Sequence, residues 1–419
     1  MLALLKNKNF TLLFVGSFVS HIGTAFYNFA VGWFILELTA SPLIAGLYIA
    51  TGGIVQVLTT PIAGVFVDRL HKVRILYITD FIRGTAVLLG GILIALSSNG
   101  MVIPLLFGIT VILALNNAFF YPAVAAIRPD IVHRDRLNQA NALFSFINSV
   151  QSIIGILLAG ILYAFLGIEL IFIINGISFI VSAISEMFIR TPHPKRPVGA
   201  EPPKVFADLK AGFAYMTQKH GLLTFMFAVL AINFAVSPIF ANGFPYLFNV
   251  VLGKEAYHLS VAQVMFSVGM LTGGLLVGVV GAKLMIGKSI RVGLTGTGIG
   301  IILIGFLMVA VSIDRLPYNT FMMLFLPTLF LTAFANVFLN VPYMTGLMRA
   351  IDQDVRGRVL AIMETLSGAM IPLSFALAGV VLEFGSIGAL ITVCLLLMVV
   401  PYCIMMFSRP SRAFLNSLI

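Results

Sequence analysis

Runs of apolar residues, separated by short polar connections, follow one another along the whole chain. The runs have about 20 or more residues, the length that an α-helix needs to cross a bilayer with some tilt. The pattern therefore predicts an all-α membrane protein. We expect twelve transmembrane helices, at residues 10–36, 41–67, 73–97, 101–123, 140–166, 168–189, 223–250, 259–284, 290–312, 317–345, 357–383 and 385–408.

The composition agrees with this pattern, because 60% of the 419 residues are hydrophobic and 10% are charged. No soluble domain of this size is so apolar. The net charge of +10 does not indicate nucleic acid as a partner, because of where the basic residues lie. Of the 25 Lys and Arg residues, only Arg83, Lys254 and Arg315 fall outside the termini and alternate loops. By the positive-inside rule, this distribution predicts a multi-pass protein of the cell membrane with both termini in the cytoplasm.

The longest connection between apolar runs divides the chain into two halves. Residues 191–204 contain five prolines and several basic residues, so we expect an extended segment. Residues 206–220 follow with apolar side chains on one helical face, which predicts an amphipathic helix on the cytoplasmic surface. The predicted organisation is an N-terminal six-helix bundle (1–189), a cytoplasmic linker (190–222) and a C-terminal six-helix bundle (223–419).

The two halves repeat each other. Three residues of the first half recur 220 residues later, where Asn336, Pro342 and Arg356 correspond to Asn116, Pro122 and Arg136. Two such halves indicate two bundles that rock around a central cavity. The charged turn after the second span also has a counterpart in the second half, in which Ala282 replaces Asp68.

That charged turn, GVFVDRLHKVR at residues 64–74, is interpreted as a gating latch at the cytoplasmic face. A glycine at the end of one helix allows another helix to approach closely. An aspartate one turn later can accept hydrogen bonds from the N-terminus of a neighbouring helix, where free N–H groups and the positive end of the dipole favour an anion. The expected latch residues are Gly64, Asp68, Arg69, Lys72 and Arg74, together with Arg356 and Arg358 from the matching loop of the second half.

The same turn resembles the G-x-x-x-D-R-x-G-R motif between the second and third helices of the major facilitator superfamily. Gly64, Asp68, Arg69 and Lys72 match it, and His71 stands in place of the second glycine. Further matches resemble the branch that holds macrolide efflux proteins, the enterobactin exporter and the lysophospholipid transporter; they lie in residues 9–83, 128–143 and 355–362. The resemblance implies the major facilitator fold, with two pseudo-symmetric six-helix bundles, and a proton-coupled secondary exporter that works by alternating access.

Five ionisable residues inside the predicted spans, or at their ends, are candidates for proton coupling. Asp80 and Arg83 are three residues apart on one helical face, and inside a membrane they must pair or face water. They form either a structural pair or a switch that opens during transport. His21 belongs either to a cavity wall or to a proton pathway. Glu364 either binds a proton or pairs with a loop arginine, and Glu37 is either an outer gate or an ordinary interfacial acid.

Amide, hydroxyl and aromatic side chains recur at matched depths in several spans and predict a substrate cavity. Prolines in the seventh span add the possibility of bending, because they free backbone carbonyls. This mixture suits a bulky amphipathic ligand better than an ion or a simple sugar. The expected cavity residues are Ser17, Thr24, Asn28, Asn116, Asn117, Tyr121, Asn233, Ser237, Asn336, Asn340 and Tyr343.

The chain carries no motif typical of an enzyme. It has no cluster with metal-ligand spacing and no phosphate-binding glycine loop, so we expect no cofactor and no metal, and an ion or substrate gradient as the energy source. The two cysteines, Cys394 and Cys403, are expected to be small core residues. The function expected first is a monomeric, proton-coupled exporter of amphipathic small molecules such as drugs or macrolides. The alternatives are a lysophospholipid or siderophore transporter, and a membrane scaffold or receptor that transports nothing.

Overall fold

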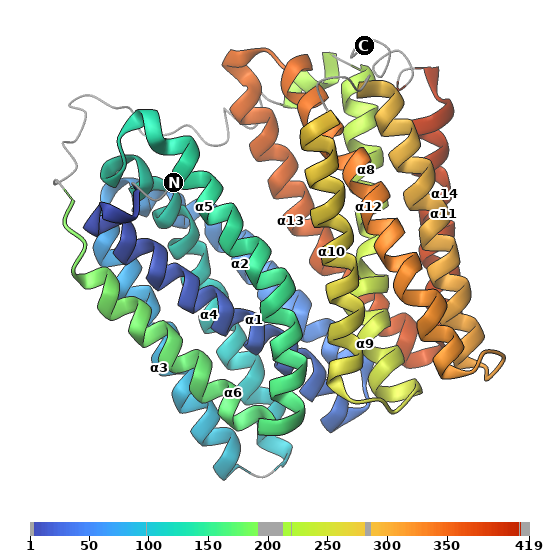
Figure 1. The fold of residues 1–419 in the computed structure, drawn as a ribbon, viewed down its shortest axis with the longest axis horizontal. Helices are drawn as coiled ribbons and strands as arrows, with labels where there is room; N and C mark the ends of the chain where they lie inside the picture. Colours follow the sequence, from blue (N-terminus) through green and yellow to red (C-terminus); the bar gives the residue numbers. More distant parts are fainter. Residues whose placement is uncertain are drawn as a thin grey trace. The chain divides into compact units, whose positions relative to one another are not determined.

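The computed structural model describes residues 4–97, 99–191, 213–218, 220–280, 286–409 and 411 of the chain (Figure 1). All the regular structure in these ranges is helical. The long helices are α1 (Lys8–Thr39), α2 (Pro42–Arg69), α3 (Lys72–Leu96), α4 (Asn99–Ile131), α5 (Leu137–Val150), α6 (Ile156–Met187), α8 (His220–Pro238), α10 (Ala256–Val280), α11 (Ile286–Ser312), α12 (Tyr318–Ala350), α13 (Gln353–Phe384) and α14 (Ile387–Phe407).

These helices confirm the predicted number of membrane spans. Eleven continuous helical segments among the described residues are long and apolar enough to cross a bilayer. One of them, Leu137–Met187, has 51 residues and contains two spans. The chain turns back within it at Gly167, whose φ of 72° lies in the left-handed region that glycine adopts without strain. The predicted fifth and sixth spans are therefore joined by a turn rather than by a loop.

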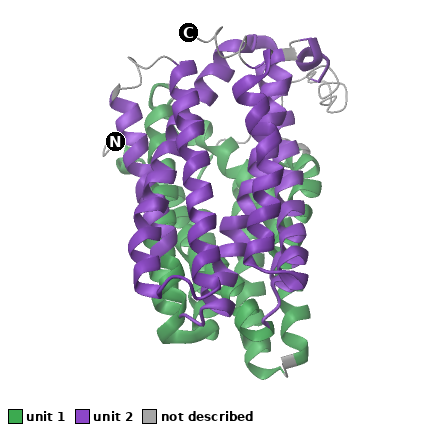
Figure 2. Ribbon diagram, turned by 90° about the vertical axis from the view of Figure 1, so that its right-hand side faces the viewer, with its two compact units in different colours: residues 1–39, 48–203, 255–260 green, residues 40–47, 204–254, 261–419 purple. Residues whose placement is uncertain are grey.

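The chain divides into two compact units (Figure 2). Unit 1 contains residues 1–39, 48–203 and 255–260, and unit 2 contains residues 40–47, 204–254 and 261–419. The main division lies within the connection that the sequence indicates as a linker. The start of α2 is counted with unit 2, and a short segment at the start of α10 is counted with unit 1.

In unit 1, α6 packs along both α1 and α3, and α3 also packs against α4. Small residues allow these contacts to be close: a Cβ added to Gly84 of α3 would lie 3.0 Å from the carbonyl oxygen of Gly176 in α6. Close packing of this kind stabilises helix association in a bilayer, where the lipid is as apolar as the side chains and no hydrophobic driving force brings helices together. The apolar core beneath includes the fully buried Phe10, Leu76 and Phe120.

In unit 2, α11 packs along α12, and α8 packs against α13 and α14. Helices α11 and α12 approach closely at Gly293, where an added Cβ would lie 2.4 Å from the backbone nitrogen of Leu339. Only a residue without a side chain fits there. Phe225, Leu294 and Leu347 are among the residues that form the apolar core of this unit.

Three helical segments hold a π-helical turn. They are η3 (Gln151–Gly155) between α5 and α6, and η4 (Ile239–Gly243) and η5 (Leu247–Val251) on either side of the short α9 (Phe244–Tyr246). The last two lie in the seventh predicted span, beside the prolines that indicated bending there. Such turns are often found at functional sites.

The predicted linker is described only in part. Its proline-rich segment from residue 192 and most of the expected amphipathic helix lie outside the described residues, whereas residues 213–218 are helical. Within that short helix, Met216 is buried in the core of unit 2 and Phe213 is exposed. The Tyr215 hydroxyl donates to the Asp352 carboxylate at 3.0 Å and accepts from the Asp352 backbone N–H at 3.1 Å. These bonds fasten the end of the linker to the start of α13.

Candidate substrate cavity and buried charge cluster

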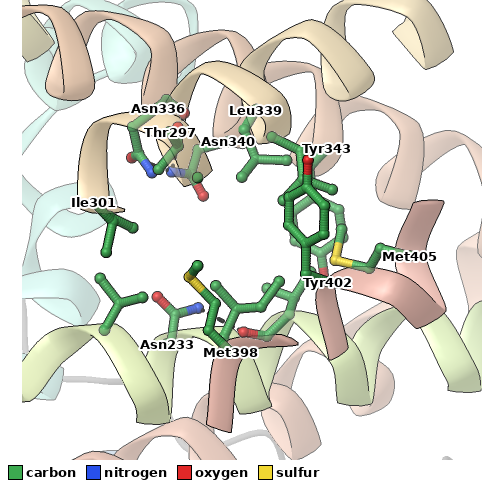
Figure 3. Close-up of a pocket in the computed structure, with 15 residues that line it drawn as sticks. Asn233, Thr297, Ile301, Asn336, Leu339, Asn340, Tyr343, Met398, Tyr402 and Met405 are labelled. Atoms are coloured by element: carbon green, nitrogen blue, oxygen red, sulfur yellow. Dashed lines mark hydrogen bonds between the residues drawn. The ribbon is translucent and has the colours of Figure 1, made fainter. Parts of the chain in front are cut away.

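Unit 2 contains a cavity of about 640 Å³, counted with the space that opens to solvent (Figure 3). Its wall is formed by α8, α11, α12 and α14. The lining is largely apolar, with amides and hydroxyls placed among aliphatic side chains and the thioethers of Met398 and Met405. None of the described residues that line it is Asp, Glu, Lys, Arg or His. A cavity with this lining suits an uncharged or weakly polar organic molecule.

The polar groups of the cavity come from two opposite sides (Figure 3). Asn336 and Asn340 project from α12, and Asn233 projects from α8 across from them. The Asn340 side-chain nitrogen donates to the Asn336 side-chain oxygen at 2.5 Å, and Asn233 donates to the Val229 carbonyl at 3.0 Å. These bonds use only part of the capacity of three amides, so donors and acceptors remain for a ligand.

Aromatic hydroxyl groups complete the lining. Tyr343 is buried and donates to the sulfur of Met363 at 3.9 Å, and Tyr402 from α14 lies at the same end of the cavity (Figure 3). The structure thus brings together four residues that the sequence singled out for the cavity: Asn233, Asn336, Asn340 and Tyr343. Sequence reasoning missed Thr297 and Tyr402. The available signal was a polar side chain within a largely apolar helix.

The other residues expected in the cavity do not line it. Ser237 is half-buried and absent from its wall, and six residues belong to unit 1: Ser17, Thr24, Asn28, Asn116, Asn117 and Tyr121. Ser17 corrects one of these expectations, because it is 0% exposed and cannot face an open cavity. Asn28, on the same helix, is exposed.

Two of these unit 1 residues form local hydrogen bonds. The Asn116 amide donates to the Ile112 carbonyl at 2.7 Å within α4. The Thr24 hydroxyl donates to the Ser20 carbonyl at 2.7 Å within α1. Such bonds satisfy a polar group inside its own helix.

Asp80 and Arg83 form a buried ion pair in unit 1. Asp80 is 0% exposed, Arg83 is 3% exposed, and an Nη2–H of the guanidinium donates to the carboxylate. Arg83 also donates to the Asn117 side-chain oxygen at 2.9 Å. Its guanidinium lies over the rings of Phe120 and Phe179, 3.9 Å and 4.7 Å from the ring centres. One cation therefore joins α3 to α4 and α6.

A second carboxylate lies beside this pair. Glu186, near the end of α6, is 0% exposed and lies within electrostatic reach of Asp80 and Arg83. Neither of its carboxyl oxygens has a hydrogen-bond partner among the described residues. Sequence reasoning gave Glu186 no role. The available signal was an acid inside the apolar stretch IVSAISEMF, one turn after Ser182.

The remaining candidates for proton coupling are His21, Glu37 and Glu364, of which His21 interacts with Arg83. The Nδ1 of His21 lies 2.7 Å from the Ser17 carbonyl, so this nitrogen carries the proton, and the ring meets Tyr121 edge-on. Glu37 is exposed and accepts a hydrogen bond from the Tyr163 hydroxyl at 2.5 Å. Glu364 is exposed on α13. Its position on the helix turns it away from the core of unit 2.

The residues of the expected latch do not form one contact. Lys72 donates to Asp130 at 2.6 Å and to the Ala126 carbonyl at 3.0 Å, which ties the start of α3 to the end of α4. Arg69 and Arg74 are exposed. The Asp68 side chain lies outside the described part of the structure.

Two further expectations about the latch are corrected or refined. Among described residues, no atom of unit 1 lies within 4 Å of the position that a Cβ would take at Gly64, so this glycine does not allow a close helix contact within its unit. In the matching loop of the second half, Arg356 donates to the Ile351 carbonyl at 3.2 Å, and Arg358 is exposed.

The family model of the Major Facilitator Superfamily matches residues 13–375 of the chain. The chain belongs to the major facilitator superfamily. Members of this superfamily are membrane transporters and not enzymes, so this major facilitator protein is a multi-pass membrane transporter.

Known proteins and solved structures agree with this assignment. Macrolide efflux protein A of Streptococcus pyogenes is 23% identical over 376 residues, which are 88% of this chain and 88% of that protein. Macrolide efflux protein A of Enterococcus faecalis is 24% identical over 317 residues, 75% of this chain and 92% of that protein. A crystal structure of a bacterial homologue of the iron transporter ferroportin in an inward-facing state has a TM-score of 0.74 at 14% identity, and the match covers 94% of this chain and 97% of that one. The structural likeness supports the fold of this major facilitator protein.

Proposed function

We propose that this transporter exports amphipathic small molecules from the cytoplasm by alternating access, driven by the proton gradient across the cell membrane. The observation that carries the proposal is the cavity of unit 2, with its apolar walls, scattered amides and hydroxyls, and absence of ionic side chains among the described lining residues. The similarity to proteins named for macrolide efflux supports export of such compounds.

The chemistry of the lining argues for an amphipathic substrate. A multiply charged anion or a metal cation would need ionic partners, because an unpaired charge is costly to remove from water. A drug-sized organic molecule instead gains from the apolar walls and needs only a few hydrogen bonds to fix its orientation. The amides of α8 and α12 and the hydroxyls of Tyr343 and Tyr402 can provide these bonds.

Proton coupling is proposed from the buried charges of unit 1. An acid and a base inside a membrane protein are costly and often mark proton pathways. Asp80 and Arg83 meet that description, and the pair is joined to three helices. We place the proton-binding step in this cluster rather than at the exposed Glu364 or Glu37.

The orientation and the gate complete the proposal. The confinement of basic residues to the termini and alternate loops supports cytoplasmic termini, and a single chain can supply both bundles, so the proposed working unit is a monomer.

Asp68 is proposed as the acid of the cytoplasmic gate. Asp68→Asn should slow turnover and change substrate binding little, as measured by transport rate and equilibrium binding on the same reconstituted sample. A large loss of binding with unchanged turnover would contradict this role.

The test of function is transport by the purified protein in proteoliposomes. With an imposed pH gradient, neutral and weakly basic amphipathic compounds such as macrolides should move against their concentration gradient. A protonophore should abolish that movement, and protein-free liposomes provide the control. Head-group-labelled lysophospholipids in the same assay test the lipid alternative. Transport that is indifferent to the pH gradient would refute the coupling, and movement of lysophospholipids alone would refute the substrate class.

A further inference from the structure

We propose that Glu186, Asp80 and Arg83 form a buried site that holds one proton, and that Glu186 carries it. The site itself follows from the geometry of unit 1. Its part in energy coupling rests on the function proposed above.

The number of charges in the cluster requires one bound proton. Two carboxyl groups, Asp80 from α3 and Glu186 from α6, share one guanidinium, that of Arg83, and all three side chains are at most 3% exposed. If both acids were ionised, the cluster would have a net negative charge in a site closed to solvent. Such a charge is avoided in proteins by taking up a proton. One proton makes the cluster neutral.

The hydrogen bonds of the two acids decide which of them holds the proton. Asp80 accepts a hydrogen bond from Arg83, which stabilises its ionised form. Neither oxygen of Glu186 has a hydrogen-bond partner within the described ranges. The Ser182 hydroxyl interacts with both acids and does not distinguish them, whereas Asp80 alone has the bond to the guanidinium. The Glu186 carboxylate is therefore the less stable anion, so the proton belongs on Glu186.

Within the described ranges, the charged groups that act on Glu186 are Asp80 and Arg83. Three elements pack against α6. From α3, Asp80 and Arg83 face Glu186. From α1, the ionisable group in this region is His21, which interacts with Arg83. The segment η3 has the sequence QSIIG and contains no acid or base.

The protonation state of the site is linked to a contact between helices through Arg83. When Glu186 is protonated, Arg83 is free to bind Asp80 and Asn117, as observed. When the proton leaves to water, the Glu186 anion competes for the guanidinium, whose Nε–H is buried and has no partner among the described residues. Movement of Arg83 toward α6 would then break its bond to Asn117 of α4. Proton release is thereby linked to a contact between helices.

The experiment is infrared difference spectroscopy of the full-length protein in liposomes, without substrate, during a pH titration in H₂O and D₂O. The wild-type protein should show the carbonyl band of one protonated carboxylic acid, which shifts in D₂O and disappears as pH rises. Glu186→Gln should lose this band. Glu255→Gln, a change at an exposed acid in the loop before α10, should retain it.

A second variant tests the charge count and does not depend on how Glu186→Gln folds. In Asp80→Asn, one acid and one base remain, so Glu186 should ionise against Arg83 and the band should again be lost. The proposal is overturned if the wild-type protein has no such band at any pH, or if the band persists in Glu186→Gln or in Asp80→Asn. These readouts need no transport, so a failure of the site is distinguished from a failure of the proposed coupling.

Discussion

Replacing Arg83 with glutamine should destabilise the protein far more than replacing Asp80 with asparagine. Arg83→Gln leaves two buried carboxyl groups with no cation, and breaking a buried ion pair from one side costs about 3–5 kcal/mol. It also removes the cation from the rings of Phe120 and Phe179, at about 1 kcal/mol each. The sum is about 5–7 kcal/mol before the site relaxes. Asp80→Asn leaves Glu186 as an alternative partner for Arg83, so its cost should be about 1–2 kcal/mol.

These free energies predict a clear difference in thermal unfolding. For a unit of about 200 residues, 1 kcal/mol changes the melting temperature by about 2–4 °C. Arg83→Gln should therefore melt about 10–28 °C below the wild type, and Asp80→Asn should melt within about 8 °C of it. The assay is thermal unfolding of detergent-solubilised protein, followed by fluorescence-detected size exclusion. The loss in Arg83→Gln should shrink as pH falls, because protonation removes the unpaired negative charges.

The double variant Asp80→Asn/Arg83→Gln tests whether the two residues act as a pair. Removing both partners takes away the unpaired charge, so the double variant should be more stable than the sum of the single losses implies, by about 1–3 kcal/mol. Simple additivity would refute the view that the two residues act as a pair. An Asp80→Asn loss larger than that of Arg83→Gln would refute the role assigned to Glu186.

Three further changes test the cavity, the helix packing and the linker. Asn340→Leu removes an amide from the cavity, so it should weaken binding of an amphipathic substrate about tenfold, as measured by equilibrium binding. Asn319 is exposed on the same helix, and Asn319→Leu should leave this binding unchanged. Gly293→Ala should lower the melting temperature by several degrees because its Cβ meets backbone, whereas Gly274→Ala has open space and should melt like the wild type. Tyr215→Phe removes both bonds of its hydroxyl, so it should destabilise the fold by about 1 kcal/mol and speed proteolysis within the linker. Gel electrophoresis of a timed digest would reveal the change, and an unchanged digest would contradict the role of the hydroxyl.

The sequence was sufficient to predict which segments cross the membrane, because length and apolar content determine that property almost alone. The twelve spans are confirmed, and even the tight turn at Gly167 fell between two predicted spans. The grouping of Asn233 with Asn336 and Asn340 also followed from depth, since residues at matched depths on adjacent helices can meet.

The rotation of each helix could not be predicted in the same way. In a soluble protein a polar face marks the outside of a helix, but in a bilayer both the lipid-facing and the core-facing sides are apolar. Nothing in the pattern therefore showed that Ser17 and Glu186 point into unit 1, or that Glu364 points away from the core of unit 2. The role of Glu186 depends on a neighbour about 100 residues away in the chain, and only the packing of α3 on α6 reveals it.

The π-helical turns in the fifth and seventh spans have an evolutionary consequence. Each holds one residue more than a regular turn, at Gln151–Gly155, Ile239–Gly243 and Leu247–Val251. A one-residue deletion there could restore a regular α-helical ladder without leaving a gap. Because the wide turn absorbs the extra residue, the side chains on either side of it would keep their places, and only those within the turn would change. Small insertions and deletions at these three places are therefore a route by which related proteins could change a few side chains without disturbing the rest of the helix.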